Sequence, residues 1–316
     1  DPTLGLRADA VMMASINTHT GATTLFSLPR QTARIPFPKD SPLHEYYPNG
    51  FFDGVSGTNP EYFLNAMYRT VPARVPHDAL GQTKNFAADV MKLSVGEALG
   101  LDVDYYVKVN MDGFKDFINA LGGITVNVNY RVPIGGQTDA HILPDSYIEP
   151  GPNQHLKGRL ALWYARGRYG LDDYSRMERQ RCVINAVVQQ ASPQNVLLNY
   201  QKVAQAGEKT IQTDIPRSML PAMLTLADRV HGTTLRSVVF RAGDGGWVSA
   251  NPNWAAVKTR VKKALKESAA SAAKPSASAT ASATAKPSTS AKPSASPTTK
   301  AKSDDLDNEC AYHPAE

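Results

Sequence analysis

The sequence lacks the short signatures of several common enzyme classes. It contains no HExxH or paired CxxC motif, no P-loop, no GxGxxG fingerprint and no GxSxG segment. These patterns supply the metal ligands, phosphate cradles or nucleophiles of those classes. Zinc hydrolases and nucleotide-binding folds therefore have little support. The seven histidines are scattered and receive no role.

Long apolar runs are also missing, and none is long enough to span a membrane. The chain opens on DPTLGLRADAV, without an initiating Met or a signal peptide. We therefore expect a fragment of a longer protein whose targeting segment and membrane anchor precede Asp1.

Cysteine is scarce. Cys182 lies within a helical pattern, and Cys310 lies in the short acidic segment DDLDNECAYHP near the end of the chain. In one interpretation the two are unrelated and one is a small buried apolar residue. In the other they form a disulfide that pins the tail to the domain in an oxidising compartment. We predict a disulfide between Cys182 and Cys310.

The segment 268–303 contains only Ala, Ser, Thr, Pro and Lys. Since it has no apolar side chain larger than Ala, burial cannot offset the entropy of ordering it, and it is predicted to be a disordered linker. We expect one folded domain over residues 1–267 and an acidic tail over 304–316. The charges after Glu267 balance, so the net charge of +5 belongs to the domain. Such a domain suits an anionic ligand or a membrane surface.

Strand and helix patterns alternate along the domain. Two apolar runs at 10–16 and 23–28, joined by the turn NTHTGA, predict a hairpin. Residues 31–83 are expected to be mainly irregular. The other expected strands are 105–109, 124–128 and 235–240, and the expected helices are 61–69, 85–99, 113–121, 155–166, 174–190, 195–206, 217–229 and 254–266. This order indicates a layered α/β fold.

The segment Arg159–Arg181 holds six Arg and no Lys. Guanidinium groups match phosphate oxygens bidentately, whereas an ammonium acts as a point charge. Asp173, Arg176 and Gln180 share one helix face, and Arg166 and Arg168 precede the intervening loop. This arrangement predicts a phosphate site. The alternative is a set of surface ion pairs, Asp173–Arg176 and Glu178–Arg181.

A second charged group flanks the predicted hairpin. Arg7 and Asp9 precede the first strand, and Arg30 follows the second, so both ends meet at one edge of the sheet. A carboxylate beside two arginines is able to hold Mg²⁺ while the arginines hold phosphate.

Four blocks of the sequence resemble the LytR-CpsA-Psr family in order and spacing. They are R-A-D at 7–9, S-L-P-R at 27–30, L-G-G-I-T-V-N-V at 121–128, and A-L-W-Y-A-R-G-R…D-D-Y-S-R-M-E-R-Q at 161–180. The resemblance covers roughly residues 4–267. It implies a three-layer α/β/α sandwich around a mixed central β-sheet. It also implies a polyprenyl-pyrophosphate ligand with its lipid in an apolar tunnel.

The activity that the resemblance implies is a Mg²⁺-assisted transfer, with Mn²⁺ as the alternative ion. A glycan phosphate passes to a peptidoglycan hydroxyl at the extracytoplasmic face of the plasma membrane, and polyprenyl phosphate is released. Asp9 is then the metal ligand, and the catalytic residues are Asp9, Arg30 and Asp173. The implied phosphate-binding residues are Arg7, Arg30, Arg166, Arg168, Arg176, Arg179 and Gln180.

The chain departs from the family pattern in three places. Gln31 stands where an Asp is usual, the block Phe63–Tyr68 lacks a Lys, and the first strand with its G-S-D motif is expected before Asp1. Two other functions therefore stay open, a polyprenyl-phosphate-binding module and a lipid pyrophosphatase. A nucleic-acid binder is disfavoured because no fold motif for it is present. The donor glycan is expected to be arabinogalactan or a teichoic-type polymer.

Overall fold

The computed structural model describes residues 6–190, 211–244, 247–272 and 304–313. The helix expected at 195–206 lies outside the described residues, as does most of the expected linker. Among the described residues, no helix has both the length and the apolar character needed to cross a bilayer.

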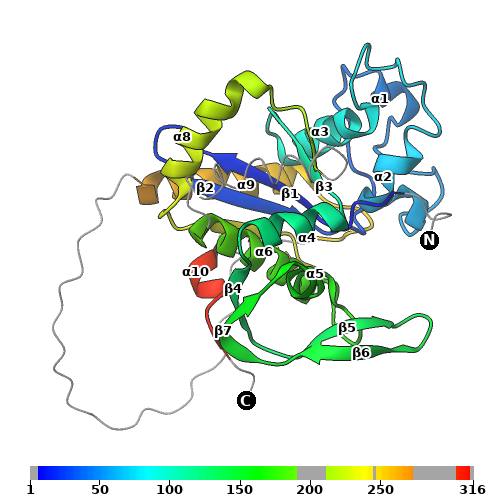
Figure 1. The fold of residues 1–316 in the computed structure, drawn as a ribbon. Coiled ribbons are helices and arrows are strands. Elements are labelled where there is room, and N and C mark those ends of the chain that lie inside the picture. The colour runs from blue at the N-terminus through cyan, green and yellow to red at the C-terminus, as the bar shows by residue number, and fades with distance from the viewer. Residues whose placement is uncertain (1–5, 191–210, 245–246, 273–303, 314–316) are drawn as a thin grey trace, which may run out of the picture.

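A four-stranded mixed sheet forms the centre of the molecule (Figure 1). Its strand order is β1-β2-β9-β10. β1 and β2 form the predicted antiparallel hairpin, β2 and β9 run parallel, and β10 closes the edge antiparallel to β9. Their bounds are Val11–Ile16, Thr23–Leu28, Arg236–Val239 and Asp304–Asp305. The hairpin turn requires Gly21 (φ +76°), where an added Cβ would lie 2.1 Å from the carbonyl oxygen of Arg229.

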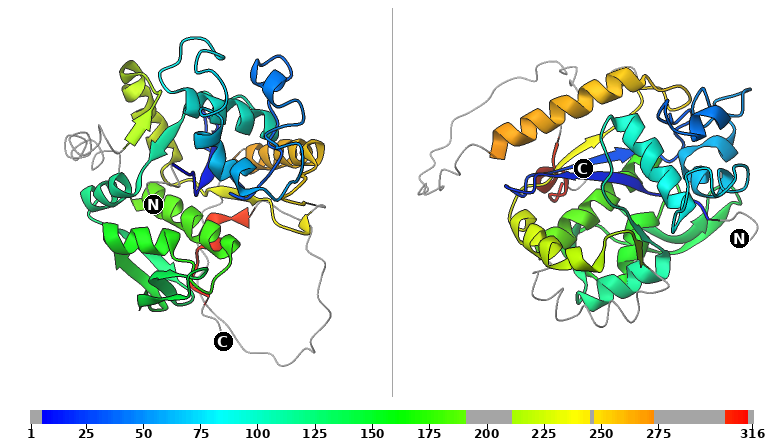
Figure 2. Two further views of the ribbon diagram at one scale, coloured as in Figure 1. Left: turned by 90° about the vertical axis from the view of Figure 1, so that its right-hand side faces the viewer. Right: turned by 90° about the horizontal axis from the view of Figure 1, so that it is seen from above.

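Helices cover both faces of this sheet because the strand side chains alternate between them. Phe26 and Val238 face one side and join a core formed with α3 (Phe86–Leu99) and α9 (Trp254–Ala272). Leu25 joins a smaller cluster with side chains of α6 (Asp173–Gln190) and α8 (Leu220–Val230). The predicted α/β class is confirmed, and the layers are visible from above in Figure 2.

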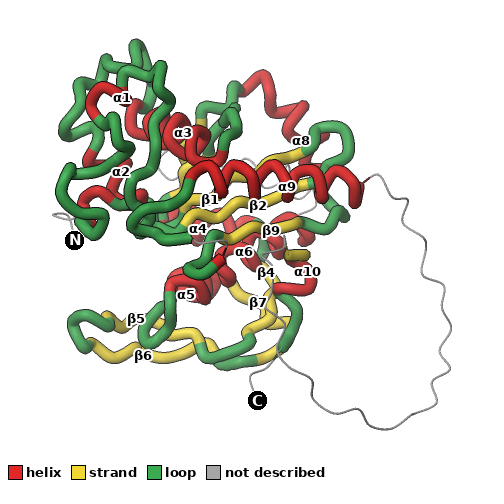
Figure 3. The backbone as a smooth tube through the Cα atoms, turned by 180° about the vertical axis from the view of Figure 1, so that it is seen from behind, coloured by secondary structure: helices red, strands yellow, loops and turns green. Residues whose placement is uncertain are grey.

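A second layer of strands lies on the side of α6 opposite to the central sheet (Figure 3). It contains the antiparallel pairs β4–β7 and β5–β6, with bounds Ile124–Val128, Gly151–Leu156, Val132–Gln137 and Ile142–Ile148. Helices α4 (Met111–Ala120) and α5 (Gly158–Arg166) accompany it. The sequence did not predict β5, β6 or β7. The helix expected from His155 begins at Gly158, because His155 and Leu156 pair with β4.

The remaining elements are short. The expected strand 105–109 is limited to β3, and the expected helix 61–69 divides into a 3₁₀ turn and α2. Their bounds, with those of the other short elements, are α1 (Leu43–Tyr46), η2 (Pro60–Tyr62), α2 (Leu64–Thr70), β3 (Val107–Val109), β8 (Ile211–Thr213), η3 (Arg217–Met219) and α10 (Leu306–Glu309).

Helix α9 continues to Ala272, past the boundary that composition placed after Glu267. Ala is the strongest helix former, so the first residues of the Ala-rich segment extend the helix. Ser271 receives a hydrogen bond from Arg236 at 3.0 Å, which ties this last turn to β9. Residues 268–272 of the predicted linker therefore belong to α9.

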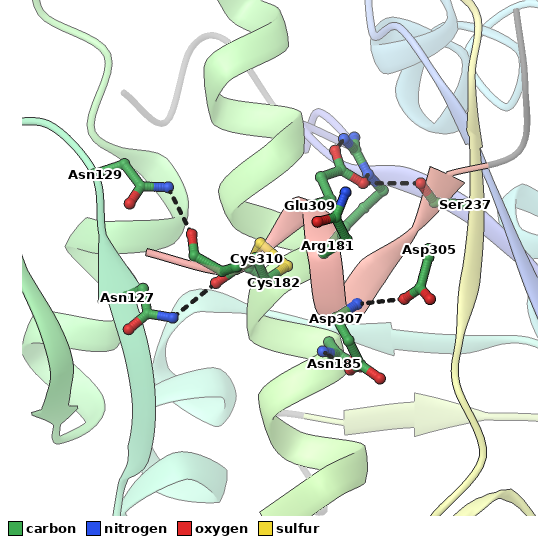
Figure 4. The surroundings of a disulfide bond; sticks show 12 residues. Asn127, Asn129, Arg181, Cys182, Asn185, Ser237, Asp305, Asp307, Glu309 and Cys310 are labelled. Carbon is green, nitrogen blue, oxygen red and sulfur yellow. Dashed lines mark hydrogen bonds and ion pairs between the residues drawn. A yellow bond between two sulfur atoms is a disulfide. The ribbon is translucent and has the colours of Figure 1, made fainter. Parts of the chain in front are cut away.

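The tail is a structural part of the domain (Figure 4). Asp304–Asp305 forms β10, and Leu306 is fully buried and donates its N–H to Leu235 O at 2.9 Å. Cys310 is joined to Cys182 by a disulfide with a Cα–Cα distance of 5.5 Å. The side chain of Asn127 donates to the carbonyl oxygen of Cys310 at 2.9 Å. The tail therefore connects the central sheet, α6 and β4.

Peptide mapping checks this disulfide. We expect the peptides that carry Cys182 and Cys310 to migrate as one linked species without reductant, when the protein is taken from an oxidising compartment. Reduction should separate them. Free thiols at both positions in such material would contradict the bond.

Candidate functional site

The candidate site lies at the end of the β1–β2 hairpin opposite to its turn. In the register of β1 and β2, Val11 lies opposite Leu28, so the chain segments that carry Asp9 and Arg30 leave the sheet at the same edge. Arg30 Nη1 donates to Asp9 Oδ1 at 3.0 Å. Arg30 Nε lies 3.3 Å from Oδ1 of Asp173, the first residue of α6. The two sequence-predicted groups therefore meet around Arg30.

Arg176 is the innermost cation of the site. Its side chain lies 2.7 Å from Asp173 Oδ1, and its Nη2 donates to the Asp9 carbonyl oxygen at 3.2 Å. The residue is only 3% exposed. Burial lowers the pKa of Arg176, Asp173 opposes this shift, and the charges of Arg30 and Arg168 lower the pKa further. The site thus concentrates positive charge in a desolvated position, which favours an anion.

Of the two ion pairs in the alternative interpretation of this helix, one is present and the other is replaced. The Asp173–Arg176 contact exists but is largely buried. Arg181 pairs with Glu309 of the tail, not with Glu178.

Arg166 and Arg168 flank Gly167 at the end of α5, and both are exposed. The guanidinium of Arg166 lies 4.8 Å from the ring centroid of Trp163. Within the described part of the chain, neither arginine has a carboxylate at ion-pair distance. The charge of Arg168 lowers the pKa of Arg176, so the two guanidinium groups interact electrostatically. Both side chains are therefore available to a ligand.

Arg179 and Gln180 donate hydrogen bonds to acceptors of the protein itself. Arg179 is 3% exposed, and it donates to Tyr164 O at 2.6 Å, to Tyr130 Oη at 2.7 Å and to Gly167 O. Gln180 Nε2 donates to Ala165 O at 3.2 Å. Each of the three nitrogens of Arg179 therefore has a protein acceptor, and so does the side-chain nitrogen of Gln180. Their phosphate-binding role stays a prediction.

Arg7 is likewise engaged elsewhere. Its guanidinium donates to Glu61 Oε1 at 2.5 Å, and Glu61 also pairs with Arg69. Residues 6–10 precede β1 and are not in a strand, so the strand-edge argument that grouped Arg7 with Arg30 does not apply to its side chain. The structure brings Asp9, Arg30 and Asp173 together but directs Arg7 to a separate ion-pair network.

Sequence reasoning missed Arg241. β9 runs parallel to β2 with Ser27 opposite Val239, so Arg241 follows β9 at the edge where Arg30 follows β2. Arg241 is exposed, and its charge contributes, after the hydrogen bonds from Ser175, to the lowered pKa of Asp172. Parallel neighbouring strands have their carboxyl ends at the same edge of a sheet. Arg241 is therefore predictable as a neighbour of Arg30 only when the order of the strands is known.

A cavity of about 380 Å³ opens between α2 and α3. Its wall includes Leu6, Pro72, Phe86 and Ala87, together with the polar residues Tyr68, Arg69, His77 and Asn85. Arg69 also belongs to the ion-pair network of Glu61 and Arg7. An apolar space therefore borders a charged network close to the start of the described chain.

The positions of the carboxylates determine whether this site is able to bind a metal ion. Among the described residues, no group of three or more His, Cys, Asp or Glu side chains is arranged to hold an ion. Asp9 and Asp173 both contact Arg30, and the Asp9 side chain is 64% exposed. Mg²⁺ is commonly held by one or two carboxylates with water and substrate phosphates. These residues fit an ion that is shared with a bound phosphate.

Three comparisons place the chain among known proteins. The polyisoprenyl-teichoic acid–peptidoglycan teichoic acid transferase TagU of Enterococcus faecalis is 28% identical over 212 residues, which are 66% of this chain and 55% of that protein. The solved protein gbs0355 of Streptococcus agalactiae has 27% identity and a TM-score of 0.57, with 83% of this chain and 81% of that chain covered. Bacillus subtilis TagV has a TM-score of 0.54 at 24% identity, with 83% and 89% covered, and shows the same fold.

The chain spans about half the length of the TagU relative that it matches. The match to a family model is more extensive, because the model of the LytR_cpsA_psr family covers residues 3–270. On that evidence, the chain belongs to the LytR_cpsA_psr family.

Proposed function

We propose that the protein transfers a glycan phosphate from a polyprenyl-pyrophosphate-linked wall polymer to a peptidoglycan hydroxyl. The observation that carries this proposal is the contact of Arg30 and Arg176 with the carboxylates of Asp9 and Asp173, beside the exposed Arg168, whose charge lowers the pKa of Arg176. The name of the TagU relative, a teichoic acid transferase acting on peptidoglycan, supports it. Such a reaction takes place at the extracytoplasmic face of the plasma membrane.

The arrangement suits phosphoryl transfer, which needs charge neutralisation and alignment more than covalent chemistry. The acceptor oxygen attacks the phosphorus that carries the glycan, and the bond from this phosphorus to the polyprenyl phosphate oxygen breaks. Arg30 and Arg176 are held by Asp173, so they neutralise the pyrophosphate without moving. The acceptor hydroxyl releases its proton to solvent as its oxygen bonds to the phosphorus.

A divalent ion complements this set. Asp9 is the residue that we expect to hold Mg²⁺, or Mn²⁺ in its place, together with phosphate oxygens of the substrate. When bound, the ion supplies further charge neutralisation at the pyrophosphate. Asp173 contacts two arginines, and this position suits the orientation of the arginines better than metal binding.

The cavity between α2 and α3 is our candidate for the first part of the lipid. Its apolar wall of Leu6, Pro72, Phe86 and Ala87 suits a prenyl chain. The donor polymer is a teichoic-type glycan or arabinogalactan, and the name of the TagU relative favours the first.

A transfer assay with the full-length protein tests the proposal. Short-chain prenyl-pyrophosphate glycans of both polymer types are mixed with soluble peptidoglycan oligomers, and mass spectrometry detects the phosphodiester product. Product from one donor confirms the activity and identifies the polymer. Release of prenyl phosphate without a coupled product would instead establish a lipid pyrophosphatase. Tight binding without turnover would establish a binding module.

The Arg166→Ala and Arg168→Ala variants should each bind a short-chain prenyl pyrophosphate about tenfold more weakly or worse, because one charge-assisted hydrogen bond contributes roughly 1.5–3 kcal/mol. Calorimetry on folded variants measures this. Arg217→Ala removes an exposed arginine of η3 and is the matched control. Wild-type affinity in both site variants would exclude the α5 end from the phosphate site.

A further inference from the structure

Arg179 donates to three acceptors that belong to α5, to its following loop and to the β4–β5 connection. We propose that Arg179, assisted by Gln180 and supported by Tyr130, is a positioning residue that holds the Arg166–Arg168 loop in its ligand-binding conformation. The inference rests on the proposed function, because it assigns Arg166 and Arg168 to the ligand. It differs from the implied phosphate-binding role of Arg179.

The end of a helix explains the need for such a residue. The last carbonyl groups of a helix lack partners within it, and cations are favourable beside them. Arg179 donates to the carbonyl oxygens of Tyr164 and Gly167, and Gln180 donates to that of Ala165. The backbone on both sides of Arg166 is thereby attached to α6.

The loop is also confined from the opposite side. At Gly167 an added Cβ would lie 2.3 Å from the carbonyl oxygen of Pro133 in β5. The Gly167 N–H donates to Trp163 O at 2.7 Å. Gly167 therefore contacts both β5 and Arg179 of α6, and its neighbours in the chain, Arg166 and Arg168, are exposed.

Tyr130 sets the orientation of Arg179. Its hydroxyl accepts from Arg179 Nη1 at 2.7 Å and donates to Ser175 O at 3.2 Å. Burial raises the pKa of the Tyr130 hydroxyl, although the charge of Arg179 lowers it, so the hydroxyl stays protonated and keeps both bonds. The hydrogen bond between Tyr130 and one terminal nitrogen of Arg179 thus fixes the guanidinium whose other terminal nitrogen donates to Gly167 O.

Electrostatics explains why the loop needs to be held. Arg30 and Arg168 both lower the pKa of Arg176, so these cations repel one another before a ligand arrives. A mobile loop would relieve the repulsion by turning Arg168 into solvent. Holding the backbone in place retains the concentrated charge, and the ligand then does not have to order the loop on binding.

The test begins with Tyr130→Phe, which removes one hydroxyl and keeps the ring. We expect a short-chain prenyl pyrophosphate to bind three- to tenfold more weakly. In the Arg166→Ala/Arg168→Ala background the same change should have no further effect, since positioning acts only through those side chains. Tyr147→Phe, on the exposed β6 strand, is the matched control and should bind as wild type.

The other outcomes are distinguishable. A full additional effect in the double-alanine background would show that Tyr130 and Arg179 contact the ligand directly, and would overturn the positioning role. Amide hydrogen exchange without ligand gives a readout independent of the proposed function. Tyr130→Phe should speed exchange at Gly167 and leave α9 unchanged. Unchanged exchange at Gly167 would overturn the inference, whereas failure of the wild type to bind the probe would overturn the proposed function alone.

Discussion

Replacing Asp9 by Asn is expected to reduce glycan transfer by about a hundredfold or more while thermal stability stays near that of the wild type. Asn keeps the shape and hydrogen-bonding capacity of Asp but lacks the charge that holds a divalent ion. Removing one preorganised charged group from a phosphoryl-transfer site has effects of this size. The folded state loses little, because the Asp9 side chain is 64% exposed and an exposed ion pair contributes about 0–1 kcal/mol.

The measurement is glycan transfer, or lipid pyrophosphate hydrolysis, across a Mg²⁺ titration with the full-length protein. Asp228→Asn on α8 removes an exposed carboxylate that has no ion pair within the described ranges, and it is the control. We expect it to retain full turnover. Full activity of Asp9→Asn with an unchanged Mg²⁺ dependence would exclude the metal role and favour the binding-module function.

Local patterns predicted the centre of the site well. The turn and strand signals of the hairpin place Asp9 and Arg30 at one edge, and helical spacing places Asp173 beside Arg176. Both inferences depend only on residues close in sequence, where periodicity fixes the geometry. The contact between the two groups through Arg30 required tertiary structure.

Other features could not be predicted from the sequence, for physical reasons. Arg179 has the same residue type as a phosphate ligand, but the carbonyl groups that it binds are presented by a different helix. Arg241 becomes a neighbour of the site only through the parallel pairing of β9 with β2. The strand β7 (GPNQHL) is largely polar, and in β6 (ILPDSYI) the apolar residues do not alternate with polar ones and are mostly exposed, so neither strand carries a clear pattern.

The tail was predictable only in its disulfide to Cys182, since composition otherwise indicates an acidic segment beyond a linker. Its attachment depends on Leu306, which fills the core, and on Glu309, which faces Arg181 of α6. Arg181 is 0% exposed, so α6 carries a buried charge whose carboxylate partner is 128 positions away in the sequence. The tail therefore supplies the carboxylate that pairs with this buried charge.

Glu309→Ala is accordingly expected to lower the free energy of unfolding by about 3–5 kcal/mol, because breaking a buried ion pair from one side leaves the other charge uncompensated. The change also removes the acceptor of Ser237 Oγ, at 2.9 Å. Urea unfolding without reductant measures the loss, with the disulfide verified in each variant. Asp307→Ala is the control from the same helix, since its exposed carboxylate accepts from Asn185 at 3.1 Å.

The carboxylate of Asp307 also accepts from Thr234 Oγ1 at 3.3 Å, so the control should cost about 1–2 kcal/mol, the usual contribution of two hydrogen bonds. A second variant, Arg181→Met with Glu309→Leu, separates charge from packing. If the uncompensated charge causes the loss, an apolar pair of similar volume should recover most of the stability, as replacing a buried ion pair with apolar residues is often neutral. An equal loss in Glu309→Ala and Asp307→Ala would mean that α10 contributes mainly through Leu306 and the disulfide, and that the charge of Arg181 is stabilised within α6 and its neighbours.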